Sequence, residues 1–263
     1  MEKKVKVVVL CQNDHFVLPA NIRLLNRIKK IELVAVVNID HSGSLENKKM
    51  LFLRGFGIVQ VFKLSLVGLS YKFVNFIDSL FGYKLQFCRS LESVATISGA
   101  VYKTVKNPNE KAFLKWLKDE EVGLIISFSA PCIFDKELLA LPLFGCINLH
   151  CSLLPRFAGL LPSFWTLFES EKTIGATVHM MDNKIDNGDI LGQVELELPN
   201  PATMFSVINV TKAAGGKLMV NTVEDLIEGN VNLTVNRIPP NGHYTWPTLL
   251  EIQKFRLNGG RLI

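Results

Sequence analysis

One apolar run with polar residues at its end constrains this chain more than any other stretch. Residues 146–149 read Cys-Ile-Asn-Leu, with Asn148 inside the run and His150 directly after it. Alternate side chains of a strand point to the same face, so Asn148 and His150 would share one face. Pro155 cannot donate to a sheet ladder, so the strand should end before it. Polar side chains at the carboxyl end of a buried strand are where α/β proteins place their chemistry.

A second apolar and β-prone segment, residues 175–181, leads to a third polar residue. It is followed by residues 182–188, which read Asp-Asn-Lys-Ile-Asp-Asn-Gly and are dense in turn formers. Asp186 in this turn is the candidate partner of Asn148 and His150. An amide, an imidazole and a carboxylate suit acyl transfer, because donors stabilise an oxyanion and histidine exchanges protons near neutral pH. The same residue types also allow a structural interpretation, with two turn formers and a satisfied histidine at a strand end.

The order and spacing of these residues resemble the folate-dependent formyltransferase family, which includes glycinamide ribonucleotide, methionyl-tRNA and nucleotide-sugar formyltransferases. The family pattern is matched by Asn148, His150, Ser152, Leu153, Leu154, Pro155, Gly159, Gly175, Thr177, His179, Asp186 and Gly188. The resemblance implies an enzyme whose catalytic residues are Asn148, His150 and Asp186. It also implies that the formyl donor is 10-formyltetrahydrofolate and that the acceptor is a primary amine.

The resemblance assigns a binding role to the loop after the strand predicted at residues 123–128. This loop would line the pocket of the folate pterin, mostly through backbone groups, with Ser129, Ala130, Pro131, Cys132 and Ile133. Asp182 would reach the pterin as well, although an aspartate of an ordinary turn is the alternative. Position 151 is a cysteine where the family pattern has proline or alanine, beside the catalytic residues but not one of them.

The remaining pattern predicts an α/β protein. Residues 5–10 form an almost continuous apolar run, as in a buried parallel strand, and residues 32–37 form the next strand. Asn109 is expected to cap a helix that starts at residue 110. A long helix is predicted to run to about residue 227, and the Gly215-Gly216 pair in its middle allows either a close approach to a neighbour or a break.

These elements lead us to expect a Rossmann-like, mostly parallel sheet flanked by helices, with a short C-terminal extension. Residues 1–200 would form the catalytic domain and residues 201–263 the C-terminal helix and extension. Residues 46–85 would form a helical insert within the catalytic domain.

The insert is predicted to contain two amphipathic helices. Charges at Arg54, Lys63, Lys72 and Asp78 interrupt every apolar run before the ~18 residues that a transmembrane helix needs. Such helices pack with their apolar faces on the core or on a partner subunit. The alternative is a basic, apolar helix that lies on a membrane surface.

Within the family, the chain looks most like the enzymes that formylate nucleotide-linked amino sugars for surface polysaccharide. Residues 12–15, in the first loop, lack the glycines or phosphate-binding serine of many members, and His15 is a candidate contact to the acceptor. Tyr244 and Trp246 are candidates for stacking on a nucleotide base, with packing on the core as the alternative. Fewer than ~80 residues follow Asp186, too few for the extra domain of the tRNA enzymes. A methionyl-tRNA formyltransferase-like enzyme and a formyltetrahydrofolate hydrolase are the alternative activities.

Composition sets further expectations. The net charge of +5 fits an anionic ligand such as folate or a nucleotide phosphate, and no block of Lys and Arg indicates a nucleic-acid partner. The five cysteines are scattered without a CxxC pair, which argues against a disulfide framework or a metal site and favours a cytoplasmic protein. The apolar run near the N-terminus is too short for a signal peptide. The resemblance suggests a homodimer.

Overall fold

A seven-stranded sheet organises the computed structural model, which describes residues 3–14, 16–40 and 45–263. The strand order is β3-β2-β1-β4-β5-β7-β8. The first five of these strands run parallel to one another, and β7 and β8 are antiparallel additions. The strands are β1 (Val5–Cys11), β2 (Ile31–Ile39), β3 (Val101–Val105), β4 (Leu124–Phe128), β5 (Cys146–His150), β7 (Thr173–Met180) and β8 (Ile190–Glu197).

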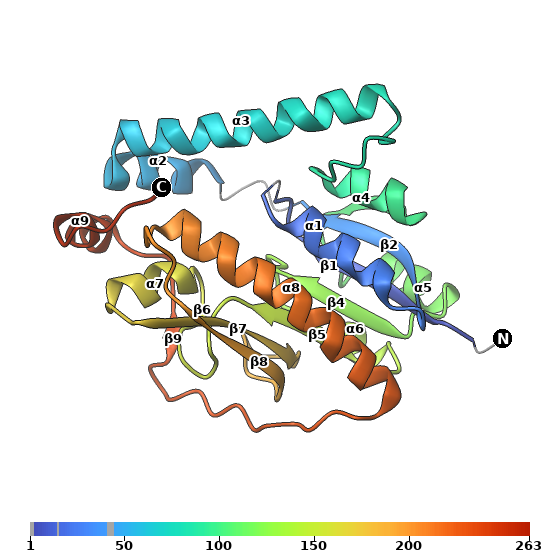
Figure 1. The fold of residues 1–263 in the computed structure, drawn as a ribbon. Helices are drawn as coiled ribbons and strands as arrows, with labels where there is room; N and C mark the ends of the chain where they lie inside the picture. Colours follow the sequence, from blue (N-terminus) through green and yellow to red (C-terminus); the bar gives the residue numbers. More distant parts are fainter. Residues whose placement is uncertain (1–2, 15, 41–44) are drawn as a thin grey trace.

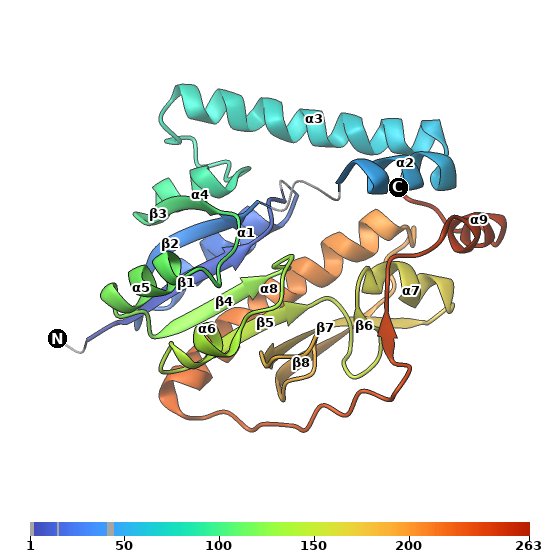
Figure 2. The ribbon, with the colours of Figure 1, turned by 180° about the vertical axis from the view of Figure 1, so that it is seen from behind.

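Helices cover both faces of the sheet, which confirms the predicted Rossmann-like architecture (Figures 1 and 2). Alternating residues of β1 enter the two resulting cores: Val7 and Val9 face one, and Val8 and Leu10 face the other. This burial on both faces explains the continuous apolar run of that strand. One face carries α1 (Leu18–Leu24) with the short helix η1 (Leu25–Arg27), α4 (Leu91–Ser98) and α8 (Met204–Glu228); the other carries α5 (Lys111–Asp119) and α6 (Lys136–Ala140).

The long helix α8 continues without a break through its two glycines. A Cβ on Gly215 would lie 2.6 Å from Leu149 of β5, and one on Gly216 would lie 2.3 Å from the side chain of Asn21 on α1. Asn21 also donates a 2.7 Å hydrogen bond to the carbonyl of Lys212. The glycines therefore serve a close approach of α8 to its neighbours.

A third apolar cluster joins the insert to the end of the chain. Phe56, Phe164, Ile252 and Phe255 lie at its centre. The cluster joins α2 (Leu45–Phe56), α3 (Ile58–Leu80), α7 (Pro162–Phe168) and α9 (Leu249–Leu257), and a small parallel sheet of β6 (Ala158–Gly159) and β9 (His243–Tyr244) lies beside it. The two predicted insert helices are thus α2 and α3, and the C-terminus lies next to α2 (Figure 1). In the described residues, no helix has the length and apolar character needed to cross a membrane.

The predicted cap at Asn109 is wrong. Glu110 occupies the N-cap position of α5 without a capping side-chain hydrogen bond. The amide of Asn109 instead donates to the carbonyl of Ile133 at 2.9 Å and accepts from the backbone N–H of Asp135 at 3.0 Å. Its polar side chain thus anchors the loop after β4, a contact over 24 residues that local capping rules do not anticipate.

Candidate active site

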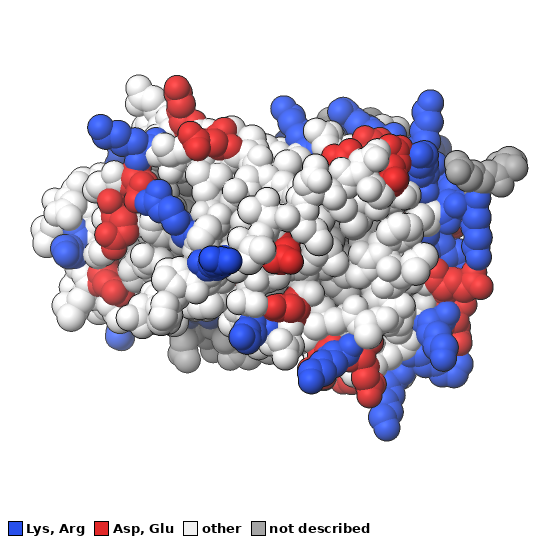
Figure 3. All heavy atoms as spheres, turned by 90° about the horizontal axis from the view of Figure 1, so that it is seen from below, with Lys and Arg blue, Asp and Glu red and all other residues white. Residues whose placement is uncertain are grey.

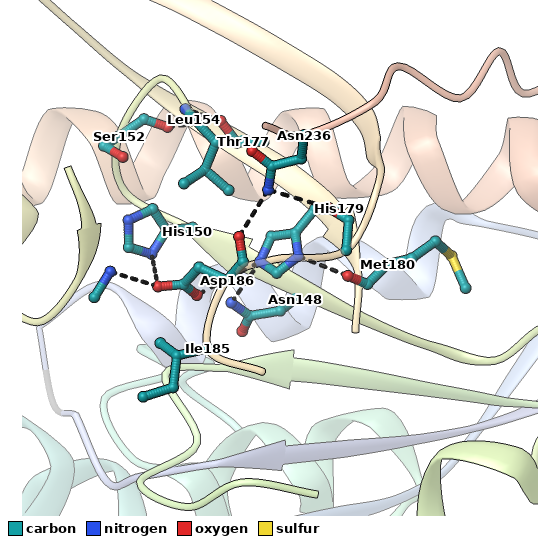
Figure 4. A network of polar contacts seen from close by, with 12 residues as sticks. Asn148, His150, Ser152, Leu154, Thr177, His179, Met180, Ile185, Asp186 and Asn236 are labelled. Carbon is teal, nitrogen blue, oxygen red and sulfur yellow. Dashed lines mark hydrogen bonds and ion pairs between the residues drawn. The ribbon is translucent and has the colours of Figure 1, made fainter. Parts of the chain in front are cut away.

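Asn148 and His150 lie on β5 and point toward the turn that follows β7 (Figure 4). Asn148 pairs in register with His179 of β7, and its Nδ2 atom lies 3.2 Å from Nε2 of that histidine. Nδ1 of His179 donates to the carbonyl of Met180 at 2.7 Å. A carbonyl only accepts, so Nδ1 carries a hydrogen, and Nε2 faces the side chains of both Asn148 and Asp186. His179 therefore fixes the orientation of the Asn148 side chain.

The turn after β7 brings Asp186 between two histidines (Figure 4). Its Oδ2 atom lies 3.4 Å from Nδ1 of His150, and its Oδ1 atom lies 3.6 Å from Nε2 of His179. The backbone N–H of Gly159 donates to Oδ2 at 2.7 Å. Burial raises the pKa of this carboxyl, but the charge of His150, the contact with His179 and the Gly159 hydrogen bond outweigh it and hold the pKa well below its usual range. Asp186 is therefore a carboxylate.

The backbone of this turn is held from a distant part of the chain. Asp186 has a φ of 49°, in the left-handed region. The amide of Asn236 donates to the carbonyl of Asp186 at 2.7 Å and to that of Gly188 at 3.2 Å. A Cβ on Gly188 would lie 2.0 Å from the carbonyl oxygen of Met180, so glycine is needed there. No sequence motif surrounds Asn236, so its role is visible only in the structure.

His150 is buried under the loop that follows β5. Its Nε2 atom lies 2.8 Å from the carbonyl oxygen of Phe157. A carbonyl only accepts, so Nε2 carries a hydrogen, while Nδ1 faces Asp186. With a proton on both nitrogens, the ring donates on each side. The hydroxyl of Ser152 donates to the carbonyl of Arg156 at 2.7 Å and helps to fold this loop back.

Thr177 on β7 anchors the same loop. Its hydroxyl donates to the carbonyl of Ser152 at 2.6 Å and accepts from the backbone N–H of Leu154 at 3.1 Å. Gln193 of β8 donates to the carbonyl of Leu154 at 2.7 Å. Ser152 and Thr177 of the sequence motif therefore hold the loop after β5 in place.

A cavity of about 220 Å³ lies at the carboxyl ends of β1, β4 and β5. Gln12 and Asn13 line one wall, and Leu149 and Cys151, which flank His150 in the chain, line another. The strand order reverses between β1 and β4, and open α/β sheets bind ligands at such a point. The cavity therefore lies at the end of the strand that carries His150, on the face of β5 to which Leu149 and Cys151 point, opposite to the face of Asn148 and His150.

An ion pair between Asp14 and Lys212 forms part of this cavity wall. Burial raises the pKa of Asp14, but the Lys212 ammonium outweighs it and lowers that pKa. Burial lowers the pKa of Lys212, but the Asp14 carboxylate outweighs it and raises that pKa. Lys212 lies on α8, 198 residues from its partner, and no sequence signal points to this pair.

A larger cleft of about 1320 Å³ lies between the insert and the ends of β1 and β2. The cleft shares Gln12 and Asn13 with the smaller cavity. Trp246 lines it, with its ring 5.8 Å from Phe52 and the ammonium of Lys48 4.6 Å above it. Aromatic rings and ammonium groups on one wall suit a ligand with a flat ring and negative charge.

The predicted pterin loop, Ser129 to Ile133, starts where β4 ends, beside the end of β5. Ser129 lines the small cavity and has a φ of 57°. In the described part of the chain, the backbone of residues 130–132 makes no hydrogen bond to another protein group. These groups fit a flat heterocycle that is bound through backbone donors and acceptors. Both carboxylate oxygens of Asp182 accept hydrogen bonds inside its own turn, from the backbone N–H of Lys184 and the amide of Asn187.

The three residues predicted to contact the acceptor, Trp246, Tyr244 and His15, differ in where the structure places them. Trp246 lines the large cleft. Tyr244 packs on Phe157 and Trp165, with ring centroids 5.3 and 5.0 Å apart, and supports the loop over His150. His15 lies outside the described residues.

The chain is similar to known formyltransferases. A family model described as formyl transferase matches residues 91–223. The methionyl-tRNA formyltransferase of Clostridium botulinum (strain Alaska E43 / Type E3) is 33% identical over 150 residues, which are 57% of this chain and 48% of that protein. The corresponding protein of Clostridium perfringens (strain 13 / Type A) is 35% identical over 131 residues, 50% of this chain and 42% of that protein. The chain thus spans about half the length of the curated relatives that it matches.

Solved structures share the fold at lower identity. A sugar N-formyltransferase from Shewanella sp FDAARGOS_354 has a TM-score of 0.58 and 16% identity, covering 96% of this chain and 87% of that one. The N-formyltransferase from Helicobacter canadensis, solved with folinic acid and dTDP-3-aminofucose, has a TM-score of 0.57 and 16% identity. The match covers 95% of this chain and 78% of that one.

Proposed function

Because this chain belongs to the formyl transferase family, whose members are folate-dependent enzymes, we propose that it moves a formyl group from 10-formyltetrahydrofolate to the amine of a nucleotide-linked amino sugar. One observation carries the proposal: the side chains of Asn148, His150 and Asp186 converge at the carboxyl edge of the sheet. The large cleft, which shares Gln12 and Asn13 with the small cavity, offers an aromatic ring and ammonium groups.

The residues of the site have distinct roles in this proposal. When bound, 10-formyltetrahydrofolate would supply the formyl carbon: the uncharged amine forms the new C–N bond and loses a proton, the bond between the formyl carbon and N10 breaks, and tetrahydrofolate is the leaving group. The amide N–H of Asn148, held by His179, donates to the oxygen on which negative charge develops. His150, whose Nε2 hydrogen is donated to the carbonyl of Phe157, faces Asp186 with Nδ1, and this nitrogen would take up the proton that the attacking amine loses. Asp186, whose pKa is held well below its usual range, is a weak base, so it orients His150 and stabilises its charged form.

Backbone groups after β4 support the binding of the donor. The backbone donors and acceptors of residues 130–132 are without protein partners in the described part of the chain, and Asn109 holds the loop at its far end. These residues would hold the pterin ring beside β5. The pterin role of Asp182 is part of this proposal, although its two oxygens are already used within the turn.

The large cleft supports a nucleotide-linked acceptor. Trp246 would stack on the base, while Lys48 and Lys49 would face the phosphates. The methionyl-tRNA formyltransferases among the curated relatives favour a tRNA acceptor as the second candidate. A homodimer, the absence of a nucleic-acid partner and a cytoplasmic location stay predictions.

A formyl-transfer assay with separate acceptors tests the proposal. The full chain is incubated with 10-formyltetrahydrofolate and nucleotide-linked amino sugars, methionyl-tRNA or no acceptor, and the products are read by mass spectrometry. A formyl mass gain on one amino sugar is the expected result. A gain on methionyl-tRNA alone would favour the second candidate, and free formate without any acceptor would indicate a hydrolase.

A further inference from the structure

The outer side of α3 is apolar and has no protein partner among the described residues. The helix runs along one edge of the molecule (Figures 1 and 2), and its inner residues Val61 and Leu64 pack on the third apolar cluster. On the outer side, apolar residues that are 49–67% exposed follow one another at intervals of three or four: Phe62, Leu66, Leu69, Phe73, Phe76 and Leu80. Such spacing places them in one stripe along the helix.

This stripe is long for a protein surface. The 23 residues of α3 correspond to roughly 35 Å at a rise of ~1.5 Å per residue. The stripe continues into the following loop, where Phe81 and Phe87 are also exposed. Contiguous apolar patches of this kind mark surfaces that bind a partner or a membrane.

The charged residues in the segment around the stripe are mostly basic. Residues 48–87 contain a single acidic residue, Asp78, which is buried and accepts hydrogen bonds from the backbone N–H groups of Leu85 and Phe87. They also contain six basic residues: Lys48, Lys49, Arg54, Lys63, Lys72 and Lys84. The face of the molecule turned away from α3 differs, because Lys or Arg and Asp or Glu side chains alternate around it (Figure 3).

Two lysines border the stripe on α3 itself. An α-helix turns once every ~3.6 residues, so Lys63 and Lys72 lie on opposite sides of the apolar side chains. Both lysines are exposed. A long lysine stem can cover apolar surface while its ammonium stays in water or meets a phosphate.

We propose that α3 binds the surface of an anionic phospholipid bilayer and lies in the plane of the membrane. The apolar stripe enters the boundary between head groups and acyl chains, and Lys63 and Lys72 meet lipid phosphates on either side. A second copy of the chain fits this face less well, because two paired α3 helices would bring lysines of like charge together. In this orientation the large cleft lies beside the bilayer, because Leu69 of the stripe and Lys72 line the cleft together with the inner residues Val61, Leu64 and Gly68.

Sedimentation with vesicles tests this proposal, with the full chain and without any formyl-transfer readout. Vesicles of phosphatidylcholine alone are compared with vesicles that contain ~30% phosphatidylglycerol, and we expect roughly tenfold more bound protein on the anionic vesicles, with a decrease at high salt. The variant Leu66→Gln/Phe73→Gln/Phe76→Gln should lose this binding. None of its three positions lines the cleft, and all three are exposed, so the fold should be kept.

A matched control replaces three exposed leucines elsewhere on the surface, Leu143→Gln/Leu233→Gln/Leu257→Gln, and should bind anionic vesicles like the wild type. Circular dichroism checks that both triple variants are folded. The proposal is overturned if the wild type does not bind the anionic vesicles or if the α3 variant binds them equally well. It is also overturned if the wild type is a dimer that the α3 variant converts to a monomer, with no binding to vesicles. Failure of the amino-sugar assay would leave these outcomes unaffected.

Discussion

The backbone N–H of Gly159 donates a 2.7 Å hydrogen bond to Oδ2 of Asp186. Gly159 has a φ of 97°, and a Cβ on it would lie 2.2 Å from the carbonyl oxygen of Tyr244. The site thus depends on a glycine that fits between the Asp186 carboxylate and β9.

Gly159→Ala should lower the free energy of unfolding by about 3 kcal/mol or more, because left-handed strain and a backbone clash add. Gly229→Ala is the matched control, with a φ of 75° and no atom within 4 Å of its Cβ, and should cost only ~1 kcal/mol. Urea unfolding measures both. Equal losses in the two variants would contradict the close contact with Tyr244.

Asp186→Asn should lower kcat/KM for formyl transfer by about 10²–10³-fold, because His150 loses its charged partner while the turn keeps its size. Asp119→Asn on α5, in an exposed pair with Lys115, should stay within about threefold of the wild type. Steady-state kinetics on folded proteins measure both. Near wild-type turnover of Asp186→Asn would remove Asp186 from the catalytic group.

The lowered pKa of Asp186 predicts the direction in which the free energy of unfolding changes at acid pH. A carboxyl with a depressed folded-state pKa stabilises the fold above its unfolded pKa of about 3.9, and this contribution is lost as the pH falls through the folded value. The difference in unfolding free energy between wild type and Asp186→Asn should therefore shrink as the pH falls from about 6 to about 3. Urea unfolding across this range tests it, and a difference that grows toward acid pH would contradict it.

Lys212→Met should cost about 3 kcal/mol of unfolding free energy, because it leaves the Asp14 carboxylate buried without its partner. The double variant Asp14→Asn/Lys212→Met should cost less than the sum of the single variants by at least ~1 kcal/mol. In the exposed pair of Lys115 and Asp119, Lys115→Met should cost below about 0.5 kcal/mol. Additive losses at positions 14 and 212 would show that the pair contributes no coupling.

Trp246→Ala should raise KM for the nucleotide-linked acceptor about tenfold with little change in kcat, because stacking on a base is worth ~1–3 kcal/mol. Trp116→Ala is the control, since its ring stacks on Phe113 of the same helix. A drop in kcat with unchanged KM would instead place Trp246 among residues that shape the reacting geometry.

Part of the geometry of the candidate site could be predicted, because strand alternation and turn formation are local. The two-residue period of a strand places Asn148 and His150 on one face, and the turn formers after β7 place Asp186 near the strand end. The role of His179 in orienting Asn148 was not predicted, although the histidine belongs to the motif. Register between β5 and β7 decides this contact, and it depends on sheet packing.

The sequence by itself determined the parallel sheet, the polar residues at its carboxyl edge and two amphipathic helices in the insert, because these follow from periodicity within short segments, and its motif carried the resemblance to the family. Only the tertiary structure decided which distant side chains complete the site. Asn236 holds the turn of Asp186 across 50 residues, and Lys212 pairs with Asp14 across 198. It also decided which side of α3 has no partner, because burial depends on the surrounding elements as well as on the helix.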